Sequence, residues 1–71
     1  MQRDPVSSSV IKSLGYSDEA RVLEVEFHTG RVYQYFLVPR ALYEKLLRAE
    51  SIGSFFNHEV RPNFEAQEVS S

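Results

Sequence analysis

The chain has 71 residues, ten acidic and eight basic side chains, a net charge of −2 and no cysteine. The lack of cysteine excludes a disulfide framework, a zinc–thiolate site and a thiol nucleophile, and it is compatible with the cytoplasmic location that we expect. No apolar run is long enough to span a membrane, and the charges are too balanced to indicate a polyanion-binding surface. We expect one domain over residues 1–71, with an ordered core at about 7–64 and flexible polar ends.

Three extended segments are predicted first. Residues 8–16 alternate weakly between apolar and polar side chains and end in a turn after Gly15. Residues 21–27 alternate cleanly, which is typical of a half-buried antiparallel strand: Leu23, Val25 and Phe27 share one face, and Val22, Glu24 and Glu26 share the other. Residues 31–38 alternate again, with Tyr33, Tyr35 and Leu37 opposite Val32, Gln34 and Phe36.

The loop between the second and third segments decides which face the two tyrosines occupy. A two-residue loop would pair Val25 with Gln34 and set the acidic residues against the tyrosines. A three-residue loop over 28–30, with Gly30 in a left-handed conformation, pairs Val25 with Tyr33 instead. Because the second register places apolar beside apolar side chains, we predict it, and with it a core-facing position for Tyr33 and Tyr35.

Two helices are predicted after the strands. Pro39 suits the first helical position, and residues 41–50 are strong helix formers with an apolar stripe at Leu42, Leu46 and Ala49. Gly53 ends this helix or follows it, and Ser54 is expected to cap a shorter helix over residues 54–60. On that helix Phe56 and Val60 lie one turn apart, and Phe64 is expected as a last core contact.

These elements predict an α+β fold. Its architecture is a three-stranded antiparallel β-meander followed by two helices packed on one face, in the order βββαα. The helices are expected to cover the face that carries Leu23, Val25, Tyr33 and Tyr35, and the acidic face is expected to stay open.

The order and spacing of a set of residues within 7–64 are distinctive: Ser8, Gly15, Tyr16, Phe27, Gly30, Tyr33, Gln34, Tyr35, Val38, Pro39, Tyr43, Ser51, Gly53, Phe55, Phe56 and Asn57. In these residues the sequence resembles the KTSC domain, a family found alone in bacterial and phage proteins and at the C-terminus of some lysyl-tRNA synthetases. The resemblance implies no established reaction. It suggests RNA as a ligand only because some members of the family are part of a tRNA ligase, and occurrence in the same protein does not establish function.

One hypothesis is that the chain binds RNA or single-stranded DNA. The candidate phosphate contacts form a basic helix edge, with two further cations beside the sheet: Arg40, Lys45 and Arg48, then Arg31 and Lys12. Glu24 and Glu26 would repel phosphate from the open sheet face, so contact is expected from the helix edge.

The alternative hypothesis is a protein-interaction or homodimerisation module. Val22, Val32 and Phe36 would form an apolar cluster on the open sheet face, where a protein partner or a second copy would bind. A catalytic role is not predicted, because His28 and His58 have no acidic or hydroxyl partner at a recognised spacing. No metal site and no cofactor are predicted.

Overall fold

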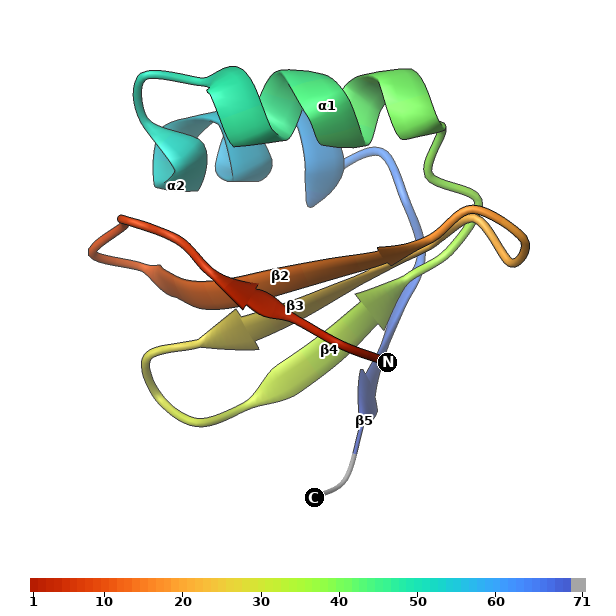
Figure 1. The fold of residues 1–71 in the computed structure, drawn as a ribbon, viewed down its shortest axis with the longest axis horizontal. Helices are drawn as coiled ribbons and strands as arrows, with labels where there is room; N and C mark the ends of the chain where they lie inside the picture. Colours follow the sequence, from red (N-terminus) through yellow and green to blue (C-terminus); the bar gives the residue numbers. More distant parts are fainter. Residues whose placement is uncertain (70–71) are drawn as a thin grey trace.

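The structure is a computed structural model that describes residues 1–69; Ser70 and Ser71, the end of the expected polar tail, lie outside the described residues. It is an α+β fold in which an antiparallel sheet of five strands, in the order β1-β2-β3-β4-β5, carries its helices on one face (Figure 1). The strands are β1 Asp4–Pro5, β2 Ile11–Ser17, β3 Val22–Phe27, β4 Val32–Tyr35 and β5 Ala66–Val69. The prediction of an α+β meander is therefore confirmed, and the predicted number of three strands is wrong.

The two added strands come from the polar end segments. The β1 strand pairs with β2, and β5 pairs with β4, so each lies at one edge of the sheet. Neither segment carries a clear apolar alternation, because an edge strand exposed to solvent is held mainly by backbone hydrogen bonds to its neighbour. Such bonds leave little trace in side-chain pattern, which is why the sequence did not indicate these strands.

The predicted hairpin register is confirmed. Val25 lies opposite Tyr33, and Leu23 lies opposite Tyr35. Gly30 has a φ of 93°, and its N–H donates a hydrogen bond of 2.9 Å to the carbonyl of Phe27. The three-residue loop therefore turns both tyrosines toward the helices.

The helical part consists of α1 Arg40–Arg48, α2 Ile52–Phe55 and a π-helical turn, η1, Phe56–Val60. Pro39 is the residue that precedes α1 rather than its first residue. Ser51, and not Ser54, caps α2: its hydroxyl oxygen accepts a hydrogen bond from the backbone N–H of Ser54 at 3.2 Å. Within residues 1–69 no helix has both the length and the apolar character to cross a membrane.

Gly53 lies inside α2 instead of ending the first helix. It is buried, and a Cβ atom at this position would lie 3.2 Å from Cγ2 of Val10. The glycine thus lies where α2 packs closely on the loop that leads into β2, which the sequence pattern does not distinguish from a helix stop.

The core lies between the helices and one face of the sheet. Phe56 and Val60 on η1 and Leu46 on α1 are fully buried against the inward side chains of the strands. Phe64 is partly buried against the same cluster, as predicted. This packing places η1 over the end of the sheet that carries the β3–β4 turn, and the candidate site lies there.

The opposite face of the sheet holds a polar network around Glu24. Arg3, next to β1, reaches across Gly15 and forms an ion pair with Glu24, while its Nε lies 3.1 Å from the hydroxyl of Ser13. Gln34 donates a 2.8 Å hydrogen bond to the same carboxylate. Burial opposes ionisation of Glu24, but the hydrogen bonds from Gln34 and Arg3 outweigh it, and the pKa of the carboxyl lies below its usual range.

Candidate functional site

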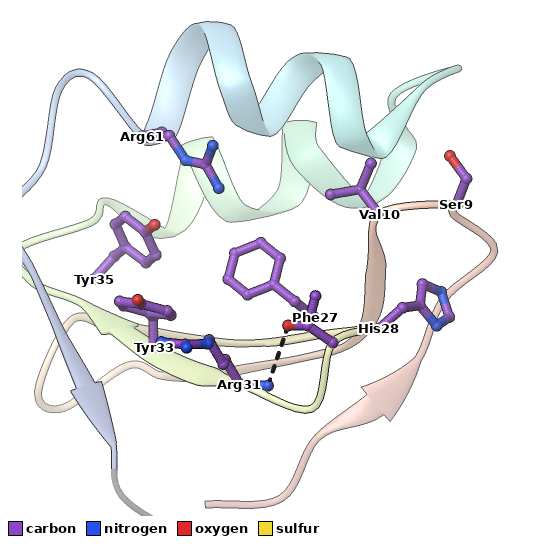
Figure 2. Close-up of a pocket in the computed structure, with 9 residues that line it drawn as sticks. Ser9, Val10, Phe27, His28, Arg31, Tyr33, Tyr35 and Arg61 are labelled. Carbon is purple, nitrogen blue, oxygen red and sulfur yellow. Dashed lines mark hydrogen bonds between the residues drawn. The ribbon is translucent and has the colours of Figure 1, made fainter.

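A pocket of about 600 Å³ opens between η1 and the end of the β3–β4 hairpin. The sheet contributes the rings of Phe27, Tyr33 and Tyr35, and Arg61 enters from the residue that follows η1. Figure 2 shows Arg61 extending from the helical side toward these rings, with His28 near the other end of the pocket. The volume falls within the range of roughly 300–1,000 Å³ that is usual for small-molecule sites.

The aromatic wall is rigid because its rings contact one another edge to face. Phe27 meets Tyr33 at a centroid distance of 5.8 Å and Phe56 at 5.7 Å. Tyr35 meets Phe56 at 5.2 Å, with the two ring planes 89° apart. Since Phe56 is fully buried, the core fixes the orientation of the rings that line the pocket.

Arg61 supplies a positive charge at the pocket. Its guanidinium carbon lies 5.4 Å from the ring centroid of Phe56 and 5.7 Å from that of Phe27, which are cation–π distances. Among residues 1–69, no carboxylate lies within ion-pair distance of Arg61. Arg31, the other arginine of the pocket, is 3.4 Å from a carboxylate oxygen of Glu68. Arg61 is therefore the cation that remains available to an anionic ligand.

The pocket also offers polar groups. The Tyr35 hydroxyl has no hydrogen-bond partner within residues 1–69, and no fully buried side-chain polar atom there is unpaired, so this hydroxyl reaches the open space of the pocket. The Tyr33 hydroxyl lies 3.5 Å from the carboxylate of Glu68. His28 donates through Nε2 to the carbonyl of Ser8 at 2.8 Å, since a carbonyl oxygen only accepts.

Aromatic faces, one unpaired guanidinium and a free hydroxyl can bind a flat ring that carries or adjoins an anion. Ser9 and Thr29 bring hydroxyl groups to the pocket, but neither is hydrogen-bonded to the imidazole of His28, which bonds the carbonyl of Ser8. In the part of the chain that the structure describes, no group of three or more histidine, aspartate or glutamate side chains is placed to hold a metal ion. The arrangement is thus suited to binding.

The five basic residues predicted from the sequence do not form one surface around this pocket. Only Arg31 lines it. Lys45 and Arg48 are exposed in the last turn of α1, and Lys12 is exposed at the irregularity where the β2–β3 register shifts.

Among the predicted phosphate contacts, Arg40 is the one whose positive charge is most neutralised by neighbouring carboxylates. Its guanidinium is 2.5 Å from Asp18 and 3.1 Å from Glu44, and these carboxylates raise the pKa of Arg40. Two carboxylates at one exposed arginine reduce its attraction for phosphate. Lys45 and Arg48 have no ion-pair partner within residues 1–69, so they are the remaining cations of the helix edge.

The predicted apolar cluster on the open sheet face is smaller than expected. Val32 is buried, because β5 brings Val69 beside it, and Val22 is half-buried. Phe36 is also half-buried and borders a separate groove with Leu37 and Phe64 at the end of the sheet. The expectation of an exposed cluster is therefore wrong for Val32.

Arg61 is the site residue that sequence reasoning missed. The backbone N–H of Arg61 donates to the carbonyl of Phe56, five residues earlier, at 2.9 Å, and this π-type turn brings the two residues together. Such turns are frequent at functional sites but have no reliable sequence pattern. The one feature of the sequence that could have pointed to Arg61 is its position directly after Val60, which belongs to the apolar stripe of the helix.

Comparisons with known proteins agree with this fold. The profile of the KTSC domain matches residues 7–64. The chain is 44% identical over 62 residues to an uncharacterised protein of Stutzerimonas stutzeri, covering 87% of each chain. It is 39% identical over 62 residues to a lysine–tRNA ligase of Nostoc punctiforme, covering 87% of this chain and 11% of that enzyme.

A solved structure shows the same arrangement of elements. The crystal structure of a KTSC domain protein from Yersinia pestis superposes with a TM-score of 0.94 at 38% sequence identity, and the match covers 97% of each chain. The match to the ligase is confined to a small part of that enzyme, so it assigns no catalytic role to the present chain. The family match and these relatives together establish that the chain belongs to the KTSC domain family.

Proposed function

We propose that this chain is a non-catalytic domain that binds single-stranded RNA or DNA, with an unpaired base held in the pocket between η1 and β4. The observation that carries the proposal is the placement of Arg61, whose unpaired guanidinium lies over the rings of Phe27 and Phe56 in the pocket that Tyr33 and Tyr35 also line. Proteins bind single strands by stacking bases on aromatic side chains and contacting the phosphates with arginine or lysine.

The pocket accounts for one nucleotide, and the helix edge accounts for further phosphates. Lys45 and Arg48 are exposed and unpaired within residues 1–69, and they follow one another at i, i+3 on α1. With two or three phosphates contacted, the logarithm of the affinity should fall against the logarithm of salt concentration with a slope of roughly −1.5 to −2. Binding should accordingly be weak and favoured at low salt.

Two further facts support a nucleic acid over another anion. The half-buried ring of Tyr33 and the free hydroxyl of Tyr35 provide a stacking surface and a hydrogen-bonding group in one pocket. A homologous segment also occurs within a protein named as a lysine–tRNA ligase, whose substrate includes RNA.

The test is the anisotropy of a fluorescently labelled, unstructured oligoribonucleotide titrated with the protein at low salt. Tyr33→Leu keeps an apolar side chain but removes the ring, and it should weaken binding by about five- to a hundredfold, the usual effect of losing one stacking ring. Arg61→Gln should weaken binding. It should also make the slope of log affinity against log salt concentration shallower, by the contribution of about one phosphate contact.

Arg40→Gln is the matched control, because it removes the same charge from an arginine already paired with Asp18 and Glu44. It should leave binding nearly unchanged, whereas Arg48→Glu should weaken it if the helix edge contributes. Equal affinity of the parent, Tyr33→Leu and Arg61→Gln, with all three melting as folded proteins, would exclude the pocket. Failure of the parent to bind RNA or single-stranded DNA would reject the proposed function itself.

A further inference from the structure

A leucine projects from the end of the sheet opposite the pocket. Leu37, between β4 and α1, is 75% exposed and has a φ of 60°. Left-handed backbone is disfavoured for residues other than glycine, asparagine and aspartate, and an exposed leucine gains nothing from burial. Hydrogen bonds within the domain, from the N–H groups of Phe36 and Val38 on either side, hold this conformation, so the fold itself keeps the leucine exposed.

Leu37 itself lines one side of an apolar groove of about 330 Å³. Its walls include the half-buried rings of Phe36 and Phe64. The same patch therefore offers both a protruding apolar side chain and a hollow of the size that such a side chain can enter. A surface with both features can be complementary to itself, as a two-fold symmetric interface requires.

Residues of opposite charge, Arg21 and Glu65, flank the groove. The N–H of Phe36 donates to the carbonyl of Glu65 at 2.9 Å, and the N–H of Val38 donates to the carbonyl of Arg21 at 2.9 Å. The backbones of Arg21 and Glu65 consequently flank Leu37 on its two sides, where the β2–β3 turn, the segment after β4 and the segment before β5 meet (Figure 1). Both charged residues are exposed, and neither has an ion-pair partner within residues 1–69.

A two-fold axis near Leu37 would form two equivalent ion pairs, each between Arg21 of one copy and Glu65 of the other. We propose that this end of the sheet, formed by Phe36, Leu37 and Phe64 and flanked by Arg21 and Glu65, is the interface of a homodimer in which each Leu37 enters the groove of its partner. A different protein could use an exposed leucine, but the alternation of charge about a central apolar residue favours a second copy. The turn at residues 28–30 lies at the other end of the β3–β4 hairpin, so dimerisation leaves both pockets open.

Sedimentation velocity of the full chain, over protein concentrations from about 1 μM to 1 mM, tests the proposal, because association in this range corresponds to a modest interface. The parent should pass from monomer to dimer. Leu37→Gly should weaken the dimer by roughly ten- to a hundredfold, the loss expected for one buried leucine side chain. Its monomer should melt no lower than the parent monomer, because glycine adopts the left-handed conformation without strain.

Charge reversal distinguishes this geometry from unspecific apolar association. Arg21→Glu and Glu65→Arg should each weaken the dimer, and the double variant should restore it, since the two residues exchange roles across the axis. A parent that stays monomeric throughout, a Leu37→Gly variant that dimerises as well as the parent, or a double variant that is weaker than both single variants would each overturn the proposal. RNA binding by a monomeric parent would still be measurable in the anisotropy assay, so the two proposals fail separately.

Discussion

The close approach of the N-terminal segment to Gly15 allows a direct test of how the open sheet face is held. A Cβ atom at Gly15 would lie 2.5 Å from the carbonyl oxygen of Gln2 and 3.1 Å from Cγ of Arg3. Side-chain atoms do not approach a backbone oxygen so closely, so Gly15→Ala must displace the chain before β1. With that displacement Arg3 leaves Glu24.

The expected loss follows from what remains around the carboxylate. Glu24 is only 5% exposed and would keep the hydrogen bond from Gln34, but it would lose its cation. Removing one partner of a buried charged group costs about 1–3 kcal/mol. Replacing glycine with alanine stabilises the fold by roughly 0.4–1 kcal/mol because it restricts the unfolded chain, so the middle of the two ranges leaves a net loss of about 1–2 kcal/mol.

Thermal unfolding followed by circular dichroism at neutral pH measures this loss. An unfolding entropy of about 2.1 cal/mol/K per residue makes each kcal/mol worth roughly 7 °C in a chain of this length, so the melting temperature should fall by about 7–15 °C. Arg3→Ala should produce a decrease of similar size, because it removes the same cation and leaves the backbone in place.

A shortened background provides the matched control. In a chain that lacks residues 1–5, nothing remains for the new methyl group to displace, so Gly15→Ala should be neutral or slightly stabilising there. If the substitution lowers the melting temperature equally in both backgrounds, the cost arises within β2 itself. The proposed displacement of the N-terminal segment would then be refuted.

Three further predictions concern the core, the turn and the acidic network. Phe56→Ala should cost about 3–5 kcal/mol in urea unfolding, because the ring is fully buried among Phe27 and Tyr35; a parent-like urea midpoint would contradict its anchoring role. Gly30→Val should lower stability by at least about 1 kcal/mol, since a β-branched residue would have to adopt a φ of 93°. The pKa of Glu24 is lowered in the folded state, so its stabilising contribution is present above the unfolded value of about 4.3 and is lost as the pH falls through the folded value. Melting temperatures measured from neutral pH to pH 2 should therefore show the advantage of the parent over Glu24→Gln shrinking in acid, and a constant difference would count against the network.

Much of the fold was determined by local sequence pattern. The alternation in residues 21–27 and 31–38 predicted the central strands, and the requirement that apolar side chains meet across the hairpin selected the three-residue loop with Gly30 left-handed. The third segment was predicted too long: β4 ends at Tyr35, and Leu37 is left-handed and exposed instead of sharing the face of the tyrosines. The helical spacing of Phe56 and Val60 likewise identified two core residues. These features were predictable because period, loop length and apolar burial act over a few neighbouring residues.

Features that depend on distant segments were decided by the tertiary structure. The edge strands β1 and β5 form because β2 and β4 offer them backbone hydrogen bonds, which require no distinctive side chains. Arg3 reaches Glu24, 21 residues away in sequence, only because Gly15 leaves space between them.

The candidate site depends on the same kind of long-range placement. The sequence by itself assigned Tyr33 and Tyr35 to the core side of the sheet, but it did not show that their hydroxyls border a pocket or that Arg61 enters it. A π-type turn and the packing of Phe56 against Phe27 bring Arg61 into that pocket. Local periodicity determines which face a side chain occupies, whereas the packing of whole elements determines which side chains meet there.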